Sequence, residues 1–380
     1  MTLLPALLLS ITHSGTARAA ELTELAPALR GDVSVRYDLD AAHADLQEGG
    51  ETVGRRVQQA HTVTYKGTFS VLDGAAVFLE VPQIAAERVS YPSAAAMAFD
   101  PAADQGTAVD TPKLSRPAGI EGSGVGGVWL GLRGTPLSEE LWANRGDRAT
   151  WMLEAGYRLQ DRTNLWTYGP RGTRGAGPGA PAFRLVSTAS TTKGKAEPYV
   201  RAAWVRTGRI NTDIVDERGR TLASGVELRP ESRFGLGVGT EVEVRRYGSD
   251  GARVALDFRG SLTYHSWQDI PSGTYLPDVL EASVGEVATQ SERVGAAGRF
   301  GVNWRFHEYV QLNLAGEAGV HTPYRAEHFY PVSAGPGLVW GATASLRFRA
   351  RDPMFDGLTP SSVDTPASRP APVASPPVGG

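Results

Sequence analysis

The sequence contains no cysteine in 380 residues. This absence excludes disulfides, thiol catalysis, iron–sulfur clusters and cysteine zinc sites, so the fold must hold without covalent cross-links. A basic excess is also lacking, because the formal net charge is -3 and lysine and arginine form no clustered run. Phosphate binding requires such a cluster, and nucleic acid is therefore excluded as a partner.

Long apolar runs are missing as well. Beyond the N-terminus, no stretch approaches the roughly 20 consecutive apolar residues of a transmembrane helix. A membrane-spanning strand, in contrast, alternates apolar and polar residues and leaves no such run. The 45 glycines and 25 prolines favour a turn-rich architecture of strands.

The clearest pattern is a pair of long alternating arms within Ser232–Trp267, joined by a glycine-containing turn. In each arm apolar residues such as Phe234 and Leu256 occupy one face, and charged residues such as Glu241 and Asp257 occupy the other. Each arm has about 16 residues, whereas an ordinary strand has about 5–6. Arms of this length and polarity suit a wall between lipid and water.

The rest of the chain repeats this alternation. We expect twelve strands, at residues 33–40, 55–72, 75–91, 122–133, 149–161, 182–191, 198–208, 232–247, 252–267, 292–306, 309–323 and 337–350. Short connections alternate with long ones, the latter at residues 41–54, 92–121, 162–181, 209–231, 268–291 and 324–336. One connection departs from this rhythm, because Thr135-Pro136 predicts the start of a brief helix over 137–144.

This rhythm predicts an all-β protein, a transmembrane antiparallel up-and-down β-barrel of about 12 strands. Both termini and the short turns would then lie in the periplasm, with the long loops outside the cell. A soluble sandwich or a lipocalin-like barrel also alternates in this way. Strand length, loop rhythm and an N-terminal export signal favour the outer membrane of a diderm bacterium.

The two ends of the chain differ in composition from the strands. Residues 1–19 predict a secretory signal peptide, with the apolar run Leu3–Ile11 followed by the small-residue site Ala17-Arg18-Ala19. Residues 20–350 would form the barrel. Residues 351–380 are rich in proline, serine, alanine and valine and predict a disordered periplasmic tail, either inert or a docking segment for periplasmic proteins.

The last expected strand carries a more specific mark. Apolar residues alternate through Leu338–Phe348, with glycine early and an aromatic residue at the end. This pattern resembles the C-terminal targeting strand of bacterial outer-membrane β-barrel proteins, of the porin and transporter kind. The resemblance implies outer-membrane lipid and lipopolysaccharide as surroundings and the barrel-assembly machinery as a partner. Such proteins commonly end at the aromatic residue, whereas this chain continues.

The opening hairpin resembles a second group of barrels. Its long arms on either side of Asp73-Gly74, with Tyr65, Phe69 and Leu79 among the apolar positions, are similar to those of hydrophobic-substrate transporters of the fatty-acid channel type. Such transporters have more strands and an N-terminal hatch, and only about a dozen residues precede the first strand here. The chain is also too short for a TonB-dependent plug domain.

Charged residues within the strands should face the lumen, because a lipid-facing Arg or Lys near the bilayer midplane costs about 2–4 kcal/mol. Parity along the strands assigns the following residues to the lumen: Arg36, Asp38, Lys66, Glu80, Glu154, Arg158, Arg201, Glu241, Glu243, Arg245, Arg253, Asp257, Arg259, Arg299, Arg305, Glu317 and Arg347. They carry a small positive excess. Either they set an electric field across a pore, or they cross-link a closed interior through ion pairs.

His265-Ser266 with Asp269 is a candidate enzymatic site, because a serine hydrolase needs a base near its hydroxyl. Neighbouring strand residues point to opposite faces, so His265 and Ser266 cannot cooperate without a bulge. His321, on a non-adjacent strand, adds little toward a metal site. We therefore predict no enzyme, no cofactor and no metal.

Two features concern the protein's surroundings. The loop 268–291 contains four acidic residues and no basic one, which suits either divalent-ion bridging to lipopolysaccharide or ordinary solvation. Four tryptophans of outward parity are candidates for the aromatic girdles of a membrane barrel: Trp151, Trp204, Trp304 and Trp340.

These observations lead to two functional hypotheses. The first is a channel or transporter that passes solutes through a charged lumen. The alternative is a non-catalytic anchor or scaffold of an envelope machine for secretion, polysaccharide export or motility. In either case, closure of the barrel predicts that strand 33–40 pairs antiparallel with strand 337–350 and brings Asp38 near Arg347 or Arg349.

Overall fold

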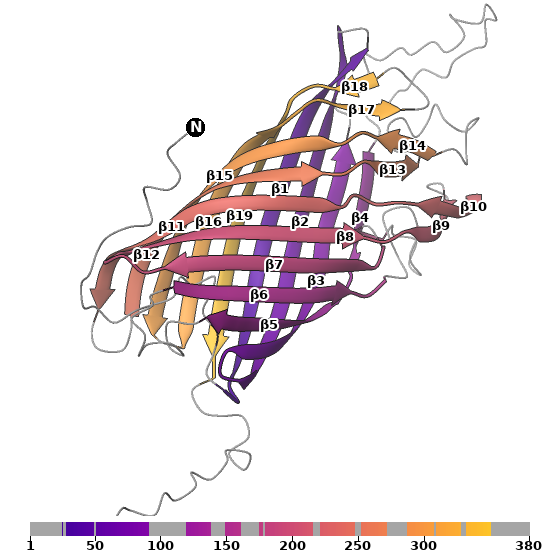
Figure 1. Cartoon of the computed structure of the whole chain (residues 1–380). Helices are drawn as coiled ribbons and strands as arrows, with labels where there is room; N and C mark the ends of the chain where they lie inside the picture. The colour runs from indigo at the N-terminus through magenta and orange to yellow at the C-terminus, as the bar shows by residue number, and fades with distance from the viewer. Residues whose placement is uncertain are drawn as a thin grey trace, which may run out of the picture.

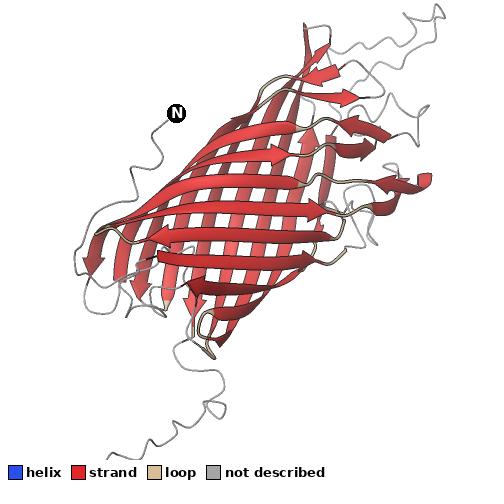
Figure 2. Ribbon diagram, viewed as in Figure 1, coloured by secondary structure: helices blue, strands red, loops and turns tan. Residues whose placement is uncertain are grey.

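The computed structural model describes residue 25 and residues 28–48, 51–90, 119–137, 149–160, 175–177, 179–215, 221–247, 252–271, 287–307, 309–327 and 332–350. Regular structure in these residues is entirely β-strand (Figure 2). Within them no helix is long and apolar enough to cross a membrane. Residues 1–19 and 351–380 lie outside this part of the chain, so the signal peptide and the tail stay predictions.

The wall is a closed antiparallel barrel of 12 strands, as predicted. Its members are β1 (Gly31–Glu48), β2 (Glu51–Leu72), β3 (Ala75–Ser90), β4 (Gly119–Val125) continued by β5 (Trp129–Leu137), β6 (Ala149–Arg158), β7 (Ala182–Thr191), β8 (Ala196–Thr207), β11 (Arg233–Tyr247), β12 (Ala252–His265), β15 (Arg293–His307), β16 (Val310–His321) and β19 (Gly337–Arg349). Each strand pairs with its neighbour along the chain, and the barrel curves around a central axis (Figure 1).

The barrel closes between its first and last strands. β1 pairs antiparallel with β19 from Asp32 opposite Arg349 to His43 opposite Leu338, which confirms the predicted closure. The predicted partner of Asp38 was wrong, because Asp38 lies opposite Thr343 and accepts a hydrogen bond from its hydroxyl at 2.9 Å. Arg347 lies opposite Ser34 and pairs instead with Asp32, at 2.7 Å.

The two ends of the barrel differ. At one end, which we call the turn end, short connections such as residues 73–74 and 192–195 join the strands. At the other, the loop end, three short strand pairs project beyond the wall (Figure 1). They are β9 (Ile210–Val215) with β10 (Thr221–Leu228), β13 (Gln268–Pro271) with β14 (Val287–Gln290), and β17 (Tyr324–Glu327) with β18 (Val332–Ala334).

The predicted long loop at 41–54 was wrong. β1 continues to Glu48 and β2 begins at Glu51, and the two strands stay paired in this region. Alternation weakens there because the hairpin rises beyond the apolar band, yet Ala44 and Leu46 are buried. The strands therefore continue here although the outward apolar residues, on which the prediction depended, stop.

The predicted helix start at Thr135-Pro136 was also wrong, because both residues belong to β5. The Thr135 backbone N–H donates to the Gly74 carbonyl at 2.7 Å, which extends the pairing of β3 with β5. Residues 138–144, the remainder of that predicted helix, lie outside the described residues.

Burial in the barrel is inverted relative to a soluble protein. Large apolar side chains of alternating strand positions cover the outer surface, for example Leu236, which is 50% exposed, and Val238, which is 62% exposed. Charged side chains at the intervening positions are buried, as Glu241 and Arg253 show. The predicted sides of the Ser232–Trp267 hairpin thus agree with the structure except at Arg245, which lies beyond a β-bulge.

Candidate functional site: the inner wall of the barrel

Strand register fixes which side chains line the inner wall, because residues opposite each other on paired strands share a face. By this criterion fourteen of the fifteen strand residues singled out most strongly by the sequence lie on the inner face, together with Lys66 and Glu80: Arg36, Asp38, Glu154, Arg158, Arg201, Glu241, Glu243, Arg253, Asp257, Arg259, Arg299, Arg305, Glu317 and Arg347.

Arg245 is the exception. A β-bulge at Val244 shifts the register, so that Glu243 lies opposite Ala255 but Arg245 lies opposite Val254. Arg245 therefore belongs to the outer face, where its guanidinium lies 4.8 Å from the centre of the Tyr247 ring. The next residue, Arg246, takes the inward position and pairs with Glu243 at 2.8 Å. A parity count cannot detect such an inserted residue.

One group of inward charges, the Lys66 cluster, lies toward the turn end. It consists of Lys66, Glu80, Arg133, Glu154 and Arg184. Glu154 is its centre, with oxygen–nitrogen distances of 2.6 Å to Arg133, 2.9 Å to Arg184 and 3.6 Å to Lys66. Glu80 adds a contact of 3.1 Å to Arg184.

Aromatic rings support this cluster from within the barrel. Phe78 and Trp129 are both buried and pack together with Ala182. Lys66 lies 4.5 Å from the Phe78 ring centre, and Arg184 lies 4.5 Å from that of Trp129. Gly131 leaves the room that Phe78 occupies, because a Cβ at this position would lie 2.5 Å from the ring.

Arg133 and Arg184 were not among the predicted lumen residues. Both could have been found by parity, because Arg184 lies between the exposed Phe183 and Leu185 on the same strand. Arg133 follows the exposed Leu132 in the same manner. Their pairing with Glu154 required the cross-strand register, which no single strand contains.

A second group, the Arg253 cluster, lies across β8, β11, β12 and β15. Arg253 contacts Glu241 at 2.9 Å and Glu197 at 3.4 Å. The Asn303 side chain donates to the second oxygen of Glu241 at 2.9 Å and accepts a hydrogen bond from Asn313. These buried groups cross-link the wall, as one of the two predicted readings requires.

The centre of the inner wall carries a different arrangement. Arg259 of β12 lies directly opposite Arg299 of β15, and Arg259 reaches Glu317 at 3.4 Å. Tyr199 crosses Gly239, where a Cβ would lie 2.5 Å from its ring, and donates to Asp257 at 2.7 Å. Arg299, in contrast, has no carboxylate of the described residues within the 4.0 Å of an ion pair.

A third group, the rim cluster, closes the wall at the loop end around Glu231. This carboxylate contacts Arg233 and Arg293, each at 2.5 Å, and His265 at 2.7 Å. Burial alone would raise the pKa of Glu231, but the neighbouring cations, led by Arg233, hold it well below its usual range. Glu231 precedes β11, so a search restricted to strands could not find it.

Part of one predicted outer loop folds against the inner wall. The Gly177 backbone N–H donates to Glu87 of β3 at 3.0 Å, and Arg158 of β6 donates to the Ala180 carbonyl at 3.0 Å. Register places Glu87 and Arg158 on the inner face. Ala180 is buried with Ile210 and Leu228. Residues 175–177 and 179–181, which we call the inner segment, therefore narrow the loop end.

The hydrolase candidate does not form. His265 bonds Glu231, the Ser266 hydroxyl accepts from the Ser232 backbone N–H at 2.9 Å, and Asp269 accepts from the Arg229 backbone N–H at 2.9 Å. Each of the three side chains thus has a separate structural partner. His321 likewise bonds its neighbour, at the Thr322 carbonyl.

The inner wall is not filled by its own side chains. Arg36 remains 48% exposed although it faces inward, Arg233 remains 61% exposed and Glu317 40%. Side chains enclosed by a barrel retain such exposure only where the interior contains free space. The structure therefore combines cross-linking clusters with accessible charges.

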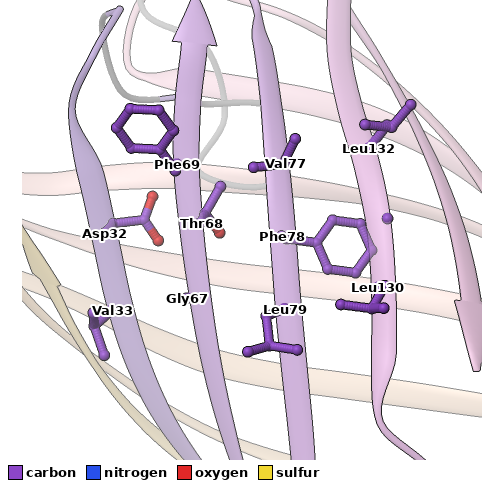
Figure 3. A pocket seen from close by; sticks show the side chains of 11 residues that line it. Asp32, Val33, Gly67, Thr68, Phe69, Val77, Phe78, Leu79, Leu130 and Leu132 are labelled. Atoms are coloured by element: carbon purple, nitrogen blue, oxygen red, sulfur yellow. The ribbon is translucent and has the colours of Figure 1, made fainter. Parts of the chain in front are cut away.

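A hollow on the outer surface has a different character. It has a volume of about 650 Å³ and spans β1, β2, β3 and β5, where Gly67 leaves a gap between larger residues (Figure 3). Outward residues around it include Val33, Leu79 and Leu132. Because these side chains face away from the lumen, the hollow belongs to the lipid-facing surface.

The fold has relatives among solved structures. The COG4313 outer membrane channel from Pseudomonas putida F1 matches with a TM-score of 0.51 and 13% identity, over 88% of this chain and 100% of that one. The chain has the fold of a bacterial outer-membrane β-barrel. A Pseudomonas aeruginosa FadL homologue (TM-score 0.37, 11% identity, 84% and 89% covered) and the CymD monoaromatic hydrocarbon channel (0.36, 11%, 89% and 95%) match less closely. No protein-family model and no curated protein sequence matches.

The tryptophans suit this outer-membrane barrel. Trp151 and Trp304 lie on the outer face toward the turn end, and Trp204 and Trp340 lie on it toward the loop end. All four are between 38% and 44% exposed. Two levels of outward tryptophan are the expected arrangement for side chains at the two membrane interfaces.

Proposed function

We propose that this protein is a passive channel of the outer membrane, which passes small hydrophilic solutes through its charged lumen. The observation that carries the proposal is the exposure of inward-facing charges within the wall strands, 48% at Arg36 and 40% at Glu317. A closed interior held by ion pairs would bury these groups as deeply as it buries Arg253, which is 4% exposed.

The inner segment lies inside the proposed channel at its loop end. It reaches from the wall at Arg158 to Glu87, and strands β4/β5 lie between these two strands. Solutes would pass beside it, among the carbonyl groups and charges of the loop end. Orientation follows from the assembly of such barrels, with both termini and the turn end in the periplasm and the loop end outside the cell.

Lipid and lipopolysaccharide would surround the apolar outer face, and the barrel-assembly machinery would insert the chain. The scaffold alternative depends on residues 351–380, which lie outside the described residues, so it stays a prediction. Co-purification of periplasmic proteins that is lost when residues 354–380 are deleted would support it.

Planar-bilayer recording tests the channel. Purified protein should produce discrete conductance steps in potassium chloride, and proteoliposomes should swell in small uncharged sugars. Folded protein, verified by its heat-dependent gel mobility, that inserts into bilayers without conductance would contradict the proposal.

A further inference from the structure

Three arginines come together at the middle of the inner wall. Arg259 and Arg299 lie opposite each other on β12 and β15. Arg201 of β8 lies opposite Gly237 of β11, the strand between β8 and β12. The three guanidinium groups thus belong to neighbouring inward positions of one wall.

The stem of Arg259 lies beside Gly237, the residue opposite Arg201. A Cβ at position 237 would lie 3.7 Å from Cδ and 3.9 Å from Cγ of Arg259. The stem of Arg259 therefore lies along the glycine, on the side of Arg201.

Other inner-wall cations are held by carboxylates at short distance, such as Arg184 at 2.9 Å and Arg347 at 2.7 Å. Among the described residues, Arg201 and Arg299 have no carboxylate within the 4.0 Å of an ion pair, and Arg259 has only the contact of 3.4 Å to Glu317. Among the described residues, Arg201 and Arg299 thus differ from the paired arginines of the clusters, and Arg259 has one longer contact.

The nearby carboxylates are already engaged. Asp257 accepts the Tyr199 hydroxyl at 2.7 Å, and Glu154 is shared by the cations of the Lys66 cluster. The Nε atoms of Arg259 and Arg299 are buried and have no hydrogen-bond partner in the described part of the chain. Guanidinium donors therefore remain at the point where like charges face each other.

Like charges directly opposite on paired strands repel, and an anion between them removes that repulsion. Guanidinium groups present parallel N–H donors that match the oxygens of carboxylate and phosphate. We propose that Arg201, Arg259 and Arg299 form a binding site for solutes that carry a carboxylate or phosphate group. This inference rests on the proposed channel and makes it selective for anions.

Inorganic phosphate is the probe, and two measurements separate the site from the channel. In a potassium chloride gradient, the reversal potential of the wild-type pore should indicate preference for chloride over potassium, and added phosphate should lower the chloride current. In detergent, phosphate should raise the unfolding temperature of the protein whether or not it conducts, because a ligand that binds only the folded state stabilises it.

The variants R259Q and R299Q should each move the reversal potential toward potassium and at least halve the phosphate effects. R259K and R299K should keep the chloride preference while weakening the phosphate effects, because lysine retains charge without paired donors. The matched control is R245Q, which removes one arginine from the outer face and should behave as wild type.

A conducting pore without chloride preference, or phosphate effects that persist in R259Q and R299Q, would overturn the anion site and leave the channel standing. Phosphate stabilisation that depends on Arg259 and Arg299 in a barrel without conductance would support the site and contradict the channel.

Discussion

Glu154 holds three cations of the inner wall together. Its carboxylate is 6% exposed and is shared by Arg133, Arg184 and Lys66, from three different strands. A buried ion pair adds modest stability by itself, whereas removal of one partner leaves uncompensated charge in a region of low polarity. Removal of the Glu154 carboxylate should therefore destabilise the barrel by more than the intact ion pairs stabilise it.

We expect Glu154→Gln to lower the free energy of unfolding by about 3–5 kcal/mol, because three cations lose a shared counter-charge. Urea unfolding in detergent micelles, followed by tryptophan fluorescence, measures this difference. Asp45→Asn is the matched control, since the Asp45–Arg55 pair is 46% and 57% exposed and should contribute no more than about 1 kcal/mol. Equal losses in the two variants would contradict the cluster's role.

Single residues also show where sequence reasoning succeeds. Alternation placed Glu241, Arg253 and Asp257 on the inner face because period two depends only on chain geometry. It failed at Arg245, where one inserted residue reverses the faces. The partner of each charge was not predictable in the same way, because it depends on the relative shift of two strands.

At the scale of elements, the rim cluster connects three strands through one short segment. The Glu231 carboxylate joins β11, β12 and β15, and the adjacent Ser232 backbone N–H donates to the Ser266 hydroxyl at 2.9 Å. A depressed carboxyl pKa stabilises the folded state above the unfolded pKa of about 4.3. That contribution declines as the pH falls below the unfolded pKa and is lost entirely below the lower, folded value.

We therefore expect the rim to stay intact from pH 7 down to about pH 4.5, still above the ordinary glutamate pKa. Glu231→Gln should release it at every pH in that range and accelerate amide hydrogen exchange at Ser232 and Ser266 by about tenfold or more. Mass spectrometry of the exchanged peptides measures the change. Glu227→Gln is the control, because Glu227 forms an exposed pair with Arg209. Faster exchange of Ser232 and Ser266 in this control would argue against a specific role of Glu231.

The inner segment is a second element that strand patterns could not predict. Its residues are mostly glycine, alanine and proline, and their composition indicates a loop without indicating its direction. Two contacts hold the segment inward. One comes from Glu87, which is far from the segment in the chain, and the other comes from Arg158, on the strand before the loop. Only the closed barrel brings these groups together.

Removal of the Glu87 carboxylate should free this segment. A hydrogen bond to a charged acceptor contributes about 1.5–3 kcal/mol, so Glu87→Ala should shift the balance from docked to released by roughly tenfold to a hundredfold. Single-channel conductance should rise as a result. Glu121→Ala is the control. The Glu121 side chain is 62% exposed, and it pairs with Arg88 on the outer face of the loop end. Unchanged conductance in Glu87→Ala would show that the segment does not narrow the path.

At the scale of the whole molecule, strand number and order were predictable because the apolar outer band imposes one rhythm on every wall strand. Closure followed from the same rhythm, since an even number of antiparallel strands brings β1 beside β19. The extent of the first hairpin was not predictable, because β1 and β2 continue beyond that band, where lipid no longer selects apolar residues.

The seam between β1 and β19 allows a direct test of closure. The Ala350 backbone N–H donates to the Gly31 carbonyl, which identifies residues 31 and 350 as a hydrogen-bonded pair. Such pairs alternate with closer, non-hydrogen-bonded ones. Ala42 and Val339, which lie opposite each other, therefore form a close pair, at the Cα separation of about 4.5 Å that a disulfide tolerates.

Ala42→Cys combined with Val339→Cys should form a disulfide on mild oxidation, in a chain with no other thiol. By the chain-entropy estimate, the bond should stabilise the barrel by about 6 kcal/mol at most, because it closes the long loop from residue 42 to residue 339. Faster migration of the boiled, unreduced protein on a denaturing gel measures the cross-link. Ala42→Cys with Ala297→Cys is the control, since β16 and β19 separate these strands. Cross-linking of the control, or its failure in the seam pair, would refute this closure.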